Sequence, residues 1–360
     1  MTRNARITVP YRSLLTASFS RRGMIALAGA GLASAALALA GCGAAGAQQA
    51  SGASAGGALK KVRFAVPGND GTLIENAGIA VKEGFLAEEL KKVGYEPVYN
   101  GFAQAGPAIN EAFSSGSIDI AEYGDLPGYS AISKGVALKA FATANSSWHY
   151  GLFVTNKSGI EKPEDLKGKK VVAGLGTLSH IYLFNLLKSV NLTPKDLEIV
   201  NSASDGPAMV TAGQADAVVS PLISIYTIDQ SIGHIIAPTN VDEYQSLAPA
   251  FLLFYRADFH KENPEVAPAI TRALLRAYEL VEQDKDKALA DLKTKSLTAD
   301  MIQKVYAGSD LSTLNPQITD AVKQKFASLV DFARENDIVK RDVSADEFFD
   351  EKVYADAGGK

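Results

Sequence analysis

The chain has 360 residues, a formal net charge of −4, one cysteine and four histidines. With this single cysteine at position 42, we expect no intramolecular disulfide, no thiolate metal cluster and no cysteine nucleophile within the mature fold. The acidic balance, with no stripe of Lys and Arg between aromatic residues, argues against nucleic acid as a partner.

The first 41 residues have the three-part layout of a secretion signal. Five arginines and no acidic residue make the leader cationic, and an apolar segment rich in Ala, Leu and Gly follows over 24–40. This segment is shorter than the roughly 20 residues of a comfortable membrane-spanning helix. It ends in Leu39-Ala40-Gly41-Cys42, which is similar to a bacterial lipobox. We therefore expect residues 1–41 to be a signal peptide and Cys42 to carry the lipid; an uncleaved signal anchor is the alternative.

The sequence also indicates an export route for the leader and the character of the segment that follows it. Ser20-Arg21-Arg22-Gly23-Met24-Ile25 resembles a twin-arginine signal, and a basic leader for the general secretion route is the alternative. Loss of the five leader arginines changes the formal net charge from −4 to −9. Residues 42–59 consist mostly of Gly, Ala, Ser and Gln, which predicts a flexible linker behind the lipid.

The folded part begins with alternating strand and helix patterns. Pro107 suits a first helical turn, and Ile109, Ala112 and Phe113 share one helix face. In chain order we predict a strand over 61–66, a helix over about 74–93, a strand over 97–99, a helix from Gly106 and a strand over 118–121. This rhythm implies a mainly parallel sheet with crossover helices.

A similar pattern returns about a hundred residues later. Gly206-Pro207 begins a second helix, as Gly106-Pro107 begins the first, and a strand is predicted over 215–219. Asp119 and Asp216 occupy matching places, within the two strands. We interpret both as structural rather than ligand-binding groups, and the repeat as a sign of two lobes built alike.

Two further strands are predicted over 148–154 and 250–255. If the lobes are alike, these segments are the two crossings that join them and form the hinge. Amphipathic helices follow from Asn263, and we place them on the first lobe. The predicted domains are therefore lobe 1, formed by residues 60–148 and 251–360, and lobe 2, formed by 149–250.

Two motifs carry a resemblance to a known family. Gly116-Ser117-Ile118-Asp119-Ile120 leading to Gly124-Asp125-Leu126-Pro127 resembles a signature of sulfonate, taurine and nitrate-type periplasmic binding proteins. Residues 160–172 are similar to their "DLKGKKV" segment. The resemblance covers about 61–255 and implies an α/β fold of the type II periplasmic binding proteins, with two similar lobes, each a central mainly parallel sheet flanked by helices, and two hinge crossings. Where many relatives carry Trp-Asp-Pro-Tyr, this chain has Ser220-Pro221-Leu222-Ile223-Ser224, so no particular substrate is carried over.

The resemblance implies an extracytoplasmic solute-binding component of an ABC importer, working with permease subunits and a cytoplasmic ATPase. Its expected ligand is a small organic anion of the sulfonate, taurine or sulfate-ester type, captured by hinge closure. A thiamine-precursor pyrimidine, a nitrate-type ligand and a sensory role without transport remain alternatives. We expect a monomer in the periplasm or at the outer face of the cytoplasmic membrane, attached to the membrane through its lipid anchor only.

No enzymatic activity, cofactor or metal is expected. The predicted folded part contains no Gly-x-Ser-x-Gly elbow, and the chain has no His-x-x-x-His spacing. A pyrimidine synthase of related fold relies on a Cys-rich motif, which this chain lacks.

Candidate ligand-binding residues lie beyond the carboxyl ends of the predicted strands, where helix N-termini also meet. Thr177 and Ser179 can cap a helix that begins at about Ser179, while its free N–H groups point at an oxyanion. Simple capping is the alternative for these two, a helix-face position for His180, and hinge packing for Trp148 and Tyr123. Few cations stand in these loops, which favours a ligand held by neutral donors. The candidates are Asn69, Asp70, Phe102, Gln104, Tyr123 and Asp125 from the first lobe, and Trp148, His149, Thr177, Ser179, His180, Ser204, Asp205 and Ser220 from the second lobe and hinge.

Overall fold

The computed structural model describes residues 58–293, 297–307, 309 and 311–359. The predicted signal peptide, Cys42 and nearly all of the predicted linker lie outside the described residues. Within the described part of the chain, no helix is both long enough and apolar enough to cross a membrane.

The first sheet has five strands in the order β2-β1-β3-β10-β4. Strand β10 runs antiparallel to both of its neighbours, whereas β1 runs parallel to β2 and β3. The strands are β1 (Lys60–Pro67), β2 (Tyr95–Phe102), β3 (Ile120–Gly124), β4 (Leu138–Asn145) and β10 (Phe251–Arg256).

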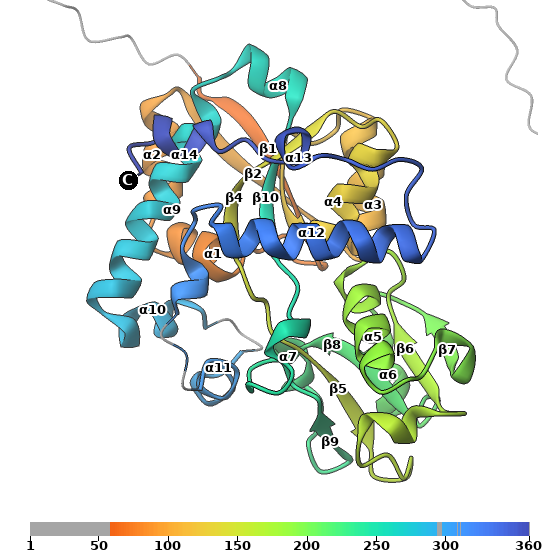
Figure 1. Ribbon diagram of the computed structural model, residues 1–360. Helices are drawn as coiled ribbons and strands as arrows, with labels where there is room; N and C mark the ends of the chain where they lie inside the picture. The colour runs from red at the N-terminus through yellow and green to blue at the C-terminus, as the bar shows by residue number, and fades with distance from the viewer. Residues whose placement is uncertain (1–57, 294–296, 308, 310, 360) are drawn as a thin grey trace, which may run out of the picture. The chain divides into compact units, whose positions relative to one another are not determined.

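The second sheet repeats this arrangement, in the order β7-β6-β8-β5-β9. Here β5 is the strand that runs antiparallel to both of its neighbours. The strands are β5 (Tyr150–Thr155), β6 (Lys170–Ala173), β7 (Glu198–Asn201), β8 (Ala217–Pro221) and β9 (Gly233–Ile236). Two similar, mainly parallel sheets flanked by helices confirm the predicted fold class (Figure 1).

Helices cover the first sheet on both faces (Figure 1). Helix α9 buries Val266, Ile270 and Leu274 and packs against α1 and α2, as its apolar spacing predicts. The helices of this lobe are α1 (Glu75–Lys82), α2 (Phe85–Lys92), α3 (Ala105–Ser114), α4 (Asp125–Ser133), α8 (Ala257–Glu262), α9 (Val266–Gln283), α10 (Lys285–Asp291), α12 (Asp320–Glu335), α13 (Ala345–Phe348) and α14 (Lys352–Asp356).

The single helix predicted over 74–93 is wrong. Gly84 adopts a left-handed conformation with φ of 77°, and this position separates α1 from α2. A residue without a Cβ takes this conformation at little cost, so the chain turns there without strain.

The second lobe has fewer helices: α5 (Leu178–Ser189), α6 (Gly206–Thr211) and α7 (Leu222–Ile225). Short 3-10 turns occur at Pro163–Leu166, Pro194–Asp196, Gln245–Leu247 and Ser312–Leu314. Helix α11 (Ala299–Val305) lies against α7, and Asn240 Nδ2 donates to the carbonyl of Lys304 at 3.1 Å. Helix α11 also packs against α10 of the first lobe, so it contacts both lobes.

Asp119 and Asp216 have the same structural role in the two lobes. They lie directly before β3 and β8 rather than within them, which corrects the predicted position. The Arg63 amide donates to Asp119 Oδ2 at 3.0 Å, and the Lys170 amide donates to Asp216 Oδ2 at 2.8 Å. Each carboxylate thereby joins its strand to the neighbouring one, and the structural interpretation is confirmed.

The two inter-lobe crossings lie side by side. The Trp148 amide in the first crossing donates to the Pro249 carbonyl in the second at 2.8 Å. Lys325 of α12 donates to the carbonyls of Ser146 and Ala248, both at 2.8 Å, and so contacts both crossings. Burial lowers the pKa of Lys325 to about 8.

Candidate functional site

A cleft of about 290 Å³ lies where loops and helix N-termini of the two lobes face each other. Its walls come from the loops after β1 and β2, the first turns of α3 and α4, the starts of α5 and α6, and the end of β8. The lining residues are Pro67, Gly68, Asn69, Ala103, Ala105, Gly106, Tyr123, Gly124, Pro127, Trp148, Tyr150, Thr177, Leu178, Ser179, Ala203, Ser204, Pro207, Ser220, Pro221, Ser224 and Phe251.

The structure brings about half of the predicted site residues together at this cleft. Those that line it are Asn69, Tyr123, Trp148, Thr177, Ser179, Ser204 and Ser220. Those that do not are Asp70, Phe102, Gln104, Asp125, His149, His180 and Asp205. A position just after a strand therefore predicts a cleft residue only in part. Whether the residue lines the cleft also depends on whether its side chain points toward the opposite lobe.

Thr177 occupies the N-cap of α5. Its Oγ1 accepts from the Ser179 amide at 3.2 Å and donates to the Gly174 carbonyl at 2.7 Å. The capping interpretation is thus confirmed for Thr177, and the helix begins at Leu178, one residue before the predicted start. Because its hydroxyl proton is used within the turn, Thr177 contributes mainly the orientation of the N–H groups of the first turn.

His180 stabilises the turn that leads into α5. Its Nδ1 accepts from the Gly176 amide at 3.2 Å, and its ring packs edge-on against Phe184 and Phe332 at 4.2 and 5.6 Å between centroids. Burial lowers the pKa of His180 to about 4, so the imidazole is neutral. His149, in the first crossing, has its pKa lowered to about 4 for the same reason.

The predicted carboxylates are used by the backbone and neighbouring hydroxyls. Asp125 Oδ1 accepts from the Leu126 amide at 2.7 Å, and its Oδ2 accepts from the Ala250 amide at 3.3 Å. Burial raises the pKa of Asp125 to about 6. Asp70 accepts from the Thr72 amide, and Asp205 accepts from the hydroxyls of Ser202 and Ser204. These carboxylates stabilise the loops around the cleft and do not line the cleft themselves.

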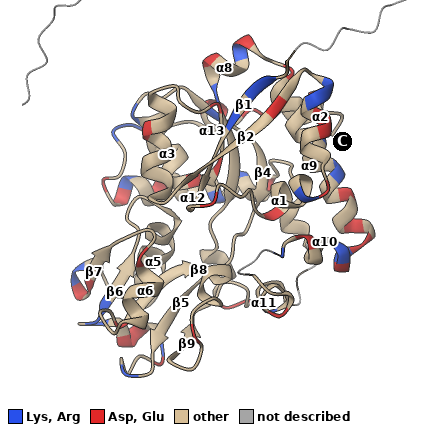
Figure 2. Ribbon diagram, turned by 180° about the vertical axis from the view of Figure 1, so that it is seen from behind, with Lys and Arg blue, Asp and Glu red and all other residues tan. Residues whose placement is uncertain are grey.

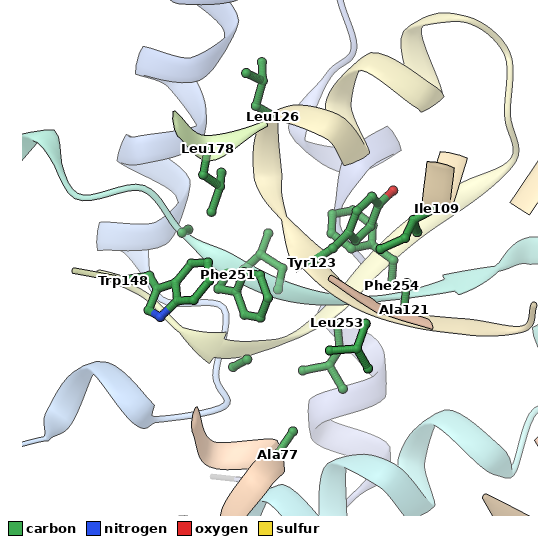
Figure 3. Packing of buried hydrophobic residues seen from close by; sticks show 14 of the residues in the cluster. Ala77, Ile109, Ala121, Tyr123, Leu126, Trp148, Leu178, Phe251, Leu253 and Phe254 are labelled. Carbon is green, nitrogen blue, oxygen red and sulfur yellow. The ribbon is translucent and has the colours of Figure 1, made fainter. Parts of the chain in front are cut away.

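One wall of the cleft is aromatic and comes from the two crossings. The Trp148 ring lies 4.3 Å from the Phe251 ring and 5.5 Å from the Tyr150 ring, between centroids. Figure 3 shows Trp148 and Phe251 adjacent to each other. Tyr150 and Phe251 were missed as site residues although both lie in predicted crossing strands; an aromatic residue near the end of each crossing was the available signal.

Tyr123 borders the cleft at the end of β3, but its side chain packs into the core. It is fully buried, its ring packs edge-on against Phe254 at 4.9 Å, and its hydroxyl donates to Asn110 Oδ1 at 3.1 Å. Figure 3 shows the Tyr123 side chain beside Phe254 and Ile109.

The polar groups of the cleft are neutral. Among the described residues that line it there is no Lys, Arg, His, Asp or Glu. Charged residues instead gather on outer helices such as α2 and α10, while β5 and β8 carry none (Figure 2). The hydroxyls of Ser220 and Ser224 form no hydrogen bond with any described residue. They are available to a ligand, together with the Leu178 N–H at the start of α5, because the Ser179 and His180 amides already donate to Thr177.

The lobes touch at a glycine of the Gly124-Asp125-Leu126-Pro127 motif. A Cβ atom on Gly124 would lie 2.5 Å from the side chain of Leu178 in α5. Since real Cβ atoms do not approach other carbons so closely, the absence of a side chain at Gly124 permits this contact.

Comparison with known proteins gives consistent matches. The model of the NMT1/THI5-like family matches residues 102–288. A putative aliphatic sulfonates-binding protein of Bacillus subtilis is 24% identical over 294 residues, 78% of this chain and 85% of that protein. The taurine-binding periplasmic protein of Escherichia coli is 28% identical over 187 residues, 49% of this chain and 54% of that protein.

A solved structure agrees with these matches. The putative periplasmic sulfonate-binding protein of a sulfonate ABC transporter from Methylobacillus flagellatus is 29% identical, with a TM-score of 0.68. The match covers 83% of this chain and 94% of that chain.

Proposed function

The chain belongs to the NMT1/THI5-like family, and on this premise we propose that it is the extracytoplasmic solute-binding component of an ABC importer, with a small organic sulfonate as its ligand. The observation that carries the proposal is a cleft between two lobes that combines neutral hydrogen-bond donors with an aromatic wall. The similarity to sulfonate-binding proteins over most of the chain supports the same ligand class.

The neutral donors suit a sulfonate head group. Its single charge is spread over three oxygens, which can accept from the Ser220 and Ser224 hydroxyls and from the Leu178 N–H at the start of α5. A helix N-terminus stabilises an anion by about 0.3–1 kcal/mol when exposed and up to about 2 kcal/mol when partly buried. The organic part of the ligand would pack against Trp148 and Phe251.

The mechanism we propose is closure of the two lobes around the ligand, with movement in the paired crossings at 146–149 and 248–250. The described surface of the cleft contains no carboxylate, so an ammonium group would be buried there without a charged partner. This favours sulfonates with uncharged organic parts over taurine.

Isothermal titration calorimetry with a panel of small ligands tests this function. We expect alkyl and aryl sulfonates to bind without turnover, and taurine to bind at least about tenfold more weakly. Binding of a pyrimidine or of nitrate alone, with no response to any sulfonate, would identify a different ligand class within the same family.

Substitution of a cleft hydroxyl provides a second test. Ser220→Ala should weaken sulfonate binding by roughly tenfold or more, because a hydrogen bond to a charged group contributes about 1.5–3 kcal/mol. The control Ser328→Ala removes an exposed hydroxyl of α12 and should leave the affinity unchanged. Equal affinities of the two variants would remove Ser220 from the site.

We also propose that residues 1–41 are a cleaved signal, that Cys42 is lipidated and that 42–59 form a tether. Cys42→Ala should move the protein from the membrane fraction to the soluble fraction, as measured by fractionation and immunoblotting. Continued membrane association of the variant would contradict the lipid anchor and favour an uncleaved signal anchor.

A further inference from the structure

Glu75 is a buried carboxylate, and its hydrogen-bond partners among the described residues are all uncharged. The residue is 2% exposed. Its Oε1 accepts from Trp148 Nε1 at 2.9 Å, and its Oε2 accepts from Asn145 Nδ2 at 3.0 Å and from the hydroxyl of Tyr306. Burying a carboxylate without a cation is costly even when it is hydrogen-bonded, and burial accordingly raises the pKa of Glu75.

The backbone at Glu75 is also unusual. The residue is the first of α1 and has φ of 53°, in the left-handed region that residues with a side chain seldom adopt. The preceding residue is fixed as well, since the Ile74 amide donates to Glu122 Oε2 at 3.0 Å. Strained backbone of this kind persists where the surrounding structure requires one particular orientation.

The three donors come from two separate parts of the chain. Asn145 and Trp148 belong to the end of β4 and the first crossing, whereas Tyr306 follows α11. The indole has a single hydrogen-bond donor, and Glu75 accepts it. The ring therefore has one preferred orientation, with Phe251 and Tyr150 beside it in the wall of the cleft.

We propose that Glu75 is a positioning residue for ligand binding, which holds the Trp148 indole as the aromatic wall of the cleft through the bond from Nε1. The inference rests on the proposed function, because it assigns the Trp148 ring to ligand contact. Glu75 itself does not line the cleft, so it acts through Trp148.

Trp148 is the chain's single tryptophan, so tryptophan fluorescence reports on this side chain alone. In the purified full chain without ligand, time-resolved anisotropy should show a rigid indole. Glu75→Met keeps the volume and removes both acceptor oxygens, so a fast component of indole motion should appear and benzenesulfonate affinity should fall at least about tenfold. Glu75→Gln retains one acceptor and should restore a rigid ring and most of the affinity.

Glu89→Gln is the matched control. Glu89 is a buried glutamate of α2 that pairs with Lys92, Arg272 and Arg276, away from the cleft. The variant is expected to lose stability while Trp148 motion and benzenesulfonate affinity stay within about twofold of the parent. If Glu89→Gln mobilises the indole as strongly as Glu75→Met, the effect is general loosening and the proposal is overturned.

A double-mutant cycle tests whether Glu75 affects ligand affinity through the Trp148 indole. Trp148→Phe removes the N–H donor, so adding Glu75→Met to it should change the affinity by less than about twofold. An undiminished effect of Glu75→Met in that background would overturn the proposal, as would a rigid Trp148 in Glu75→Met itself.

The proposal can still be tested if Glu75→Met does not fold or if the parent protein binds no sulfonate. If Glu75→Met does not fold, Glu75→Asp withdraws the carboxylate by one methylene and should mobilise the indole; a rigid ring in that variant overturns the proposal. If the parent protein binds no sulfonate, the proposed function fails by calorimetry. The ligand-free anisotropy still decides whether Glu75 positions Trp148.

Discussion

His180 shows how a residue can serve a binding cleft without entering it. Its ring lies between Phe184 and Phe332, and Nδ1 accepts from the Gly176 amide in the turn that leads into α5. Protonation of Nδ1 would abolish that hydrogen bond. The turn that presents the N–H groups of α5 therefore depends on a neutral imidazole.

The pH dependence of stability follows from the lowered pKa. The folded protein binds the His180 proton more weakly than the unfolded chain does, because the pKa falls from 6.5 to about 4. This contribution to stability is complete above about pH 6.5 and is lost as pH falls toward 4. Between about pH 7 and 4.5, the parent should lose about 1–3 kcal/mol more unfolding free energy than His180→Asn, which retains an acceptor but does not titrate.

Urea denaturation at a series of pH values measures this difference. Comparing parent and variant cancels the contributions of other groups, including Asp125, whose raised pKa acts in the opposite direction. His180→Phe, which also loses the bond to Gly176, should show the same flattened profile with lower stability at neutral pH. Parallel profiles of the parent and His180→Asn would rule out His180 as the source.

The sequence predicted individual site residues where local rules decide their geometry. Thr177 was predicted as a cap because a hydroxyl before a helix acts within its own turn. Asp125 was expected in the cleft, but both of its oxygens accept backbone amides, one of them from Ala250 in the second crossing. Phe251 was missed because its contact with Trp148 joins segments a hundred residues apart. Tyr150 lies two residues after Trp148, and it was missed because its place in the cleft wall depends on how the two crossings pack together.

The duplicated helix-strand unit could be predicted because both copies begin the helix with Gly-Pro-Ala and place a Gly three residues before the Asp. The units α3-β3 and α6-β8 occupy matching places in the two sheets. The division between α1 and α2 could not be predicted, because the apolar pattern continues across Gly84. The turn between the helices depends on the left-handed backbone of Gly84. The contact between α11 and the second lobe was also missed, since it depends on tertiary packing.

The paired aspartates should affect stability and leave binding alone. Asp216→Ala removes the acceptor of the Lys170 amide and should lower the free energy of unfolding by about 1–3 kcal/mol. Chemical denaturation measures this loss, and calorimetry should show sulfonate affinity within about twofold of the parent. Asp242→Ala, at an exposed position, is the control and should change neither quantity. A selective loss of affinity in Asp216→Ala would mean that the aspartate does act on the ligand.

In the molecule as a whole, Gly124 allows the two lobes to approach closely at Leu178. Its backbone, with φ of −68° and ψ of 154°, would accept alanine, so the effect of Gly124→Ala comes from the added Cβ against Leu178. Overpacking of a tight contact costs about 1–3 kcal/mol, and we expect sulfonate affinity to fall by roughly tenfold.

The compensating variant is Gly124→Ala with Leu178→Ala, which removes the clashing side chain and should recover most of the lost affinity. Calorimetry of both variants, with small-angle scattering in the presence and absence of sulfonate, separates impaired closure from misfolding. Unchanged affinity in Gly124→Ala would show that this approach of the lobes is not needed for binding.

The position of β10 also determines the order in which the protein can fold. This strand inserts between β3 and β4, yet it follows the whole second sheet in the chain. While the chain emerges from the ribosome, β3 and β4 lack their shared partner until about residue 256 is available. The second sheet, contiguous from Tyr150 to Ile236, can form first, whereas the unfinished first sheet exposes unpaired strand edges that invite aggregation.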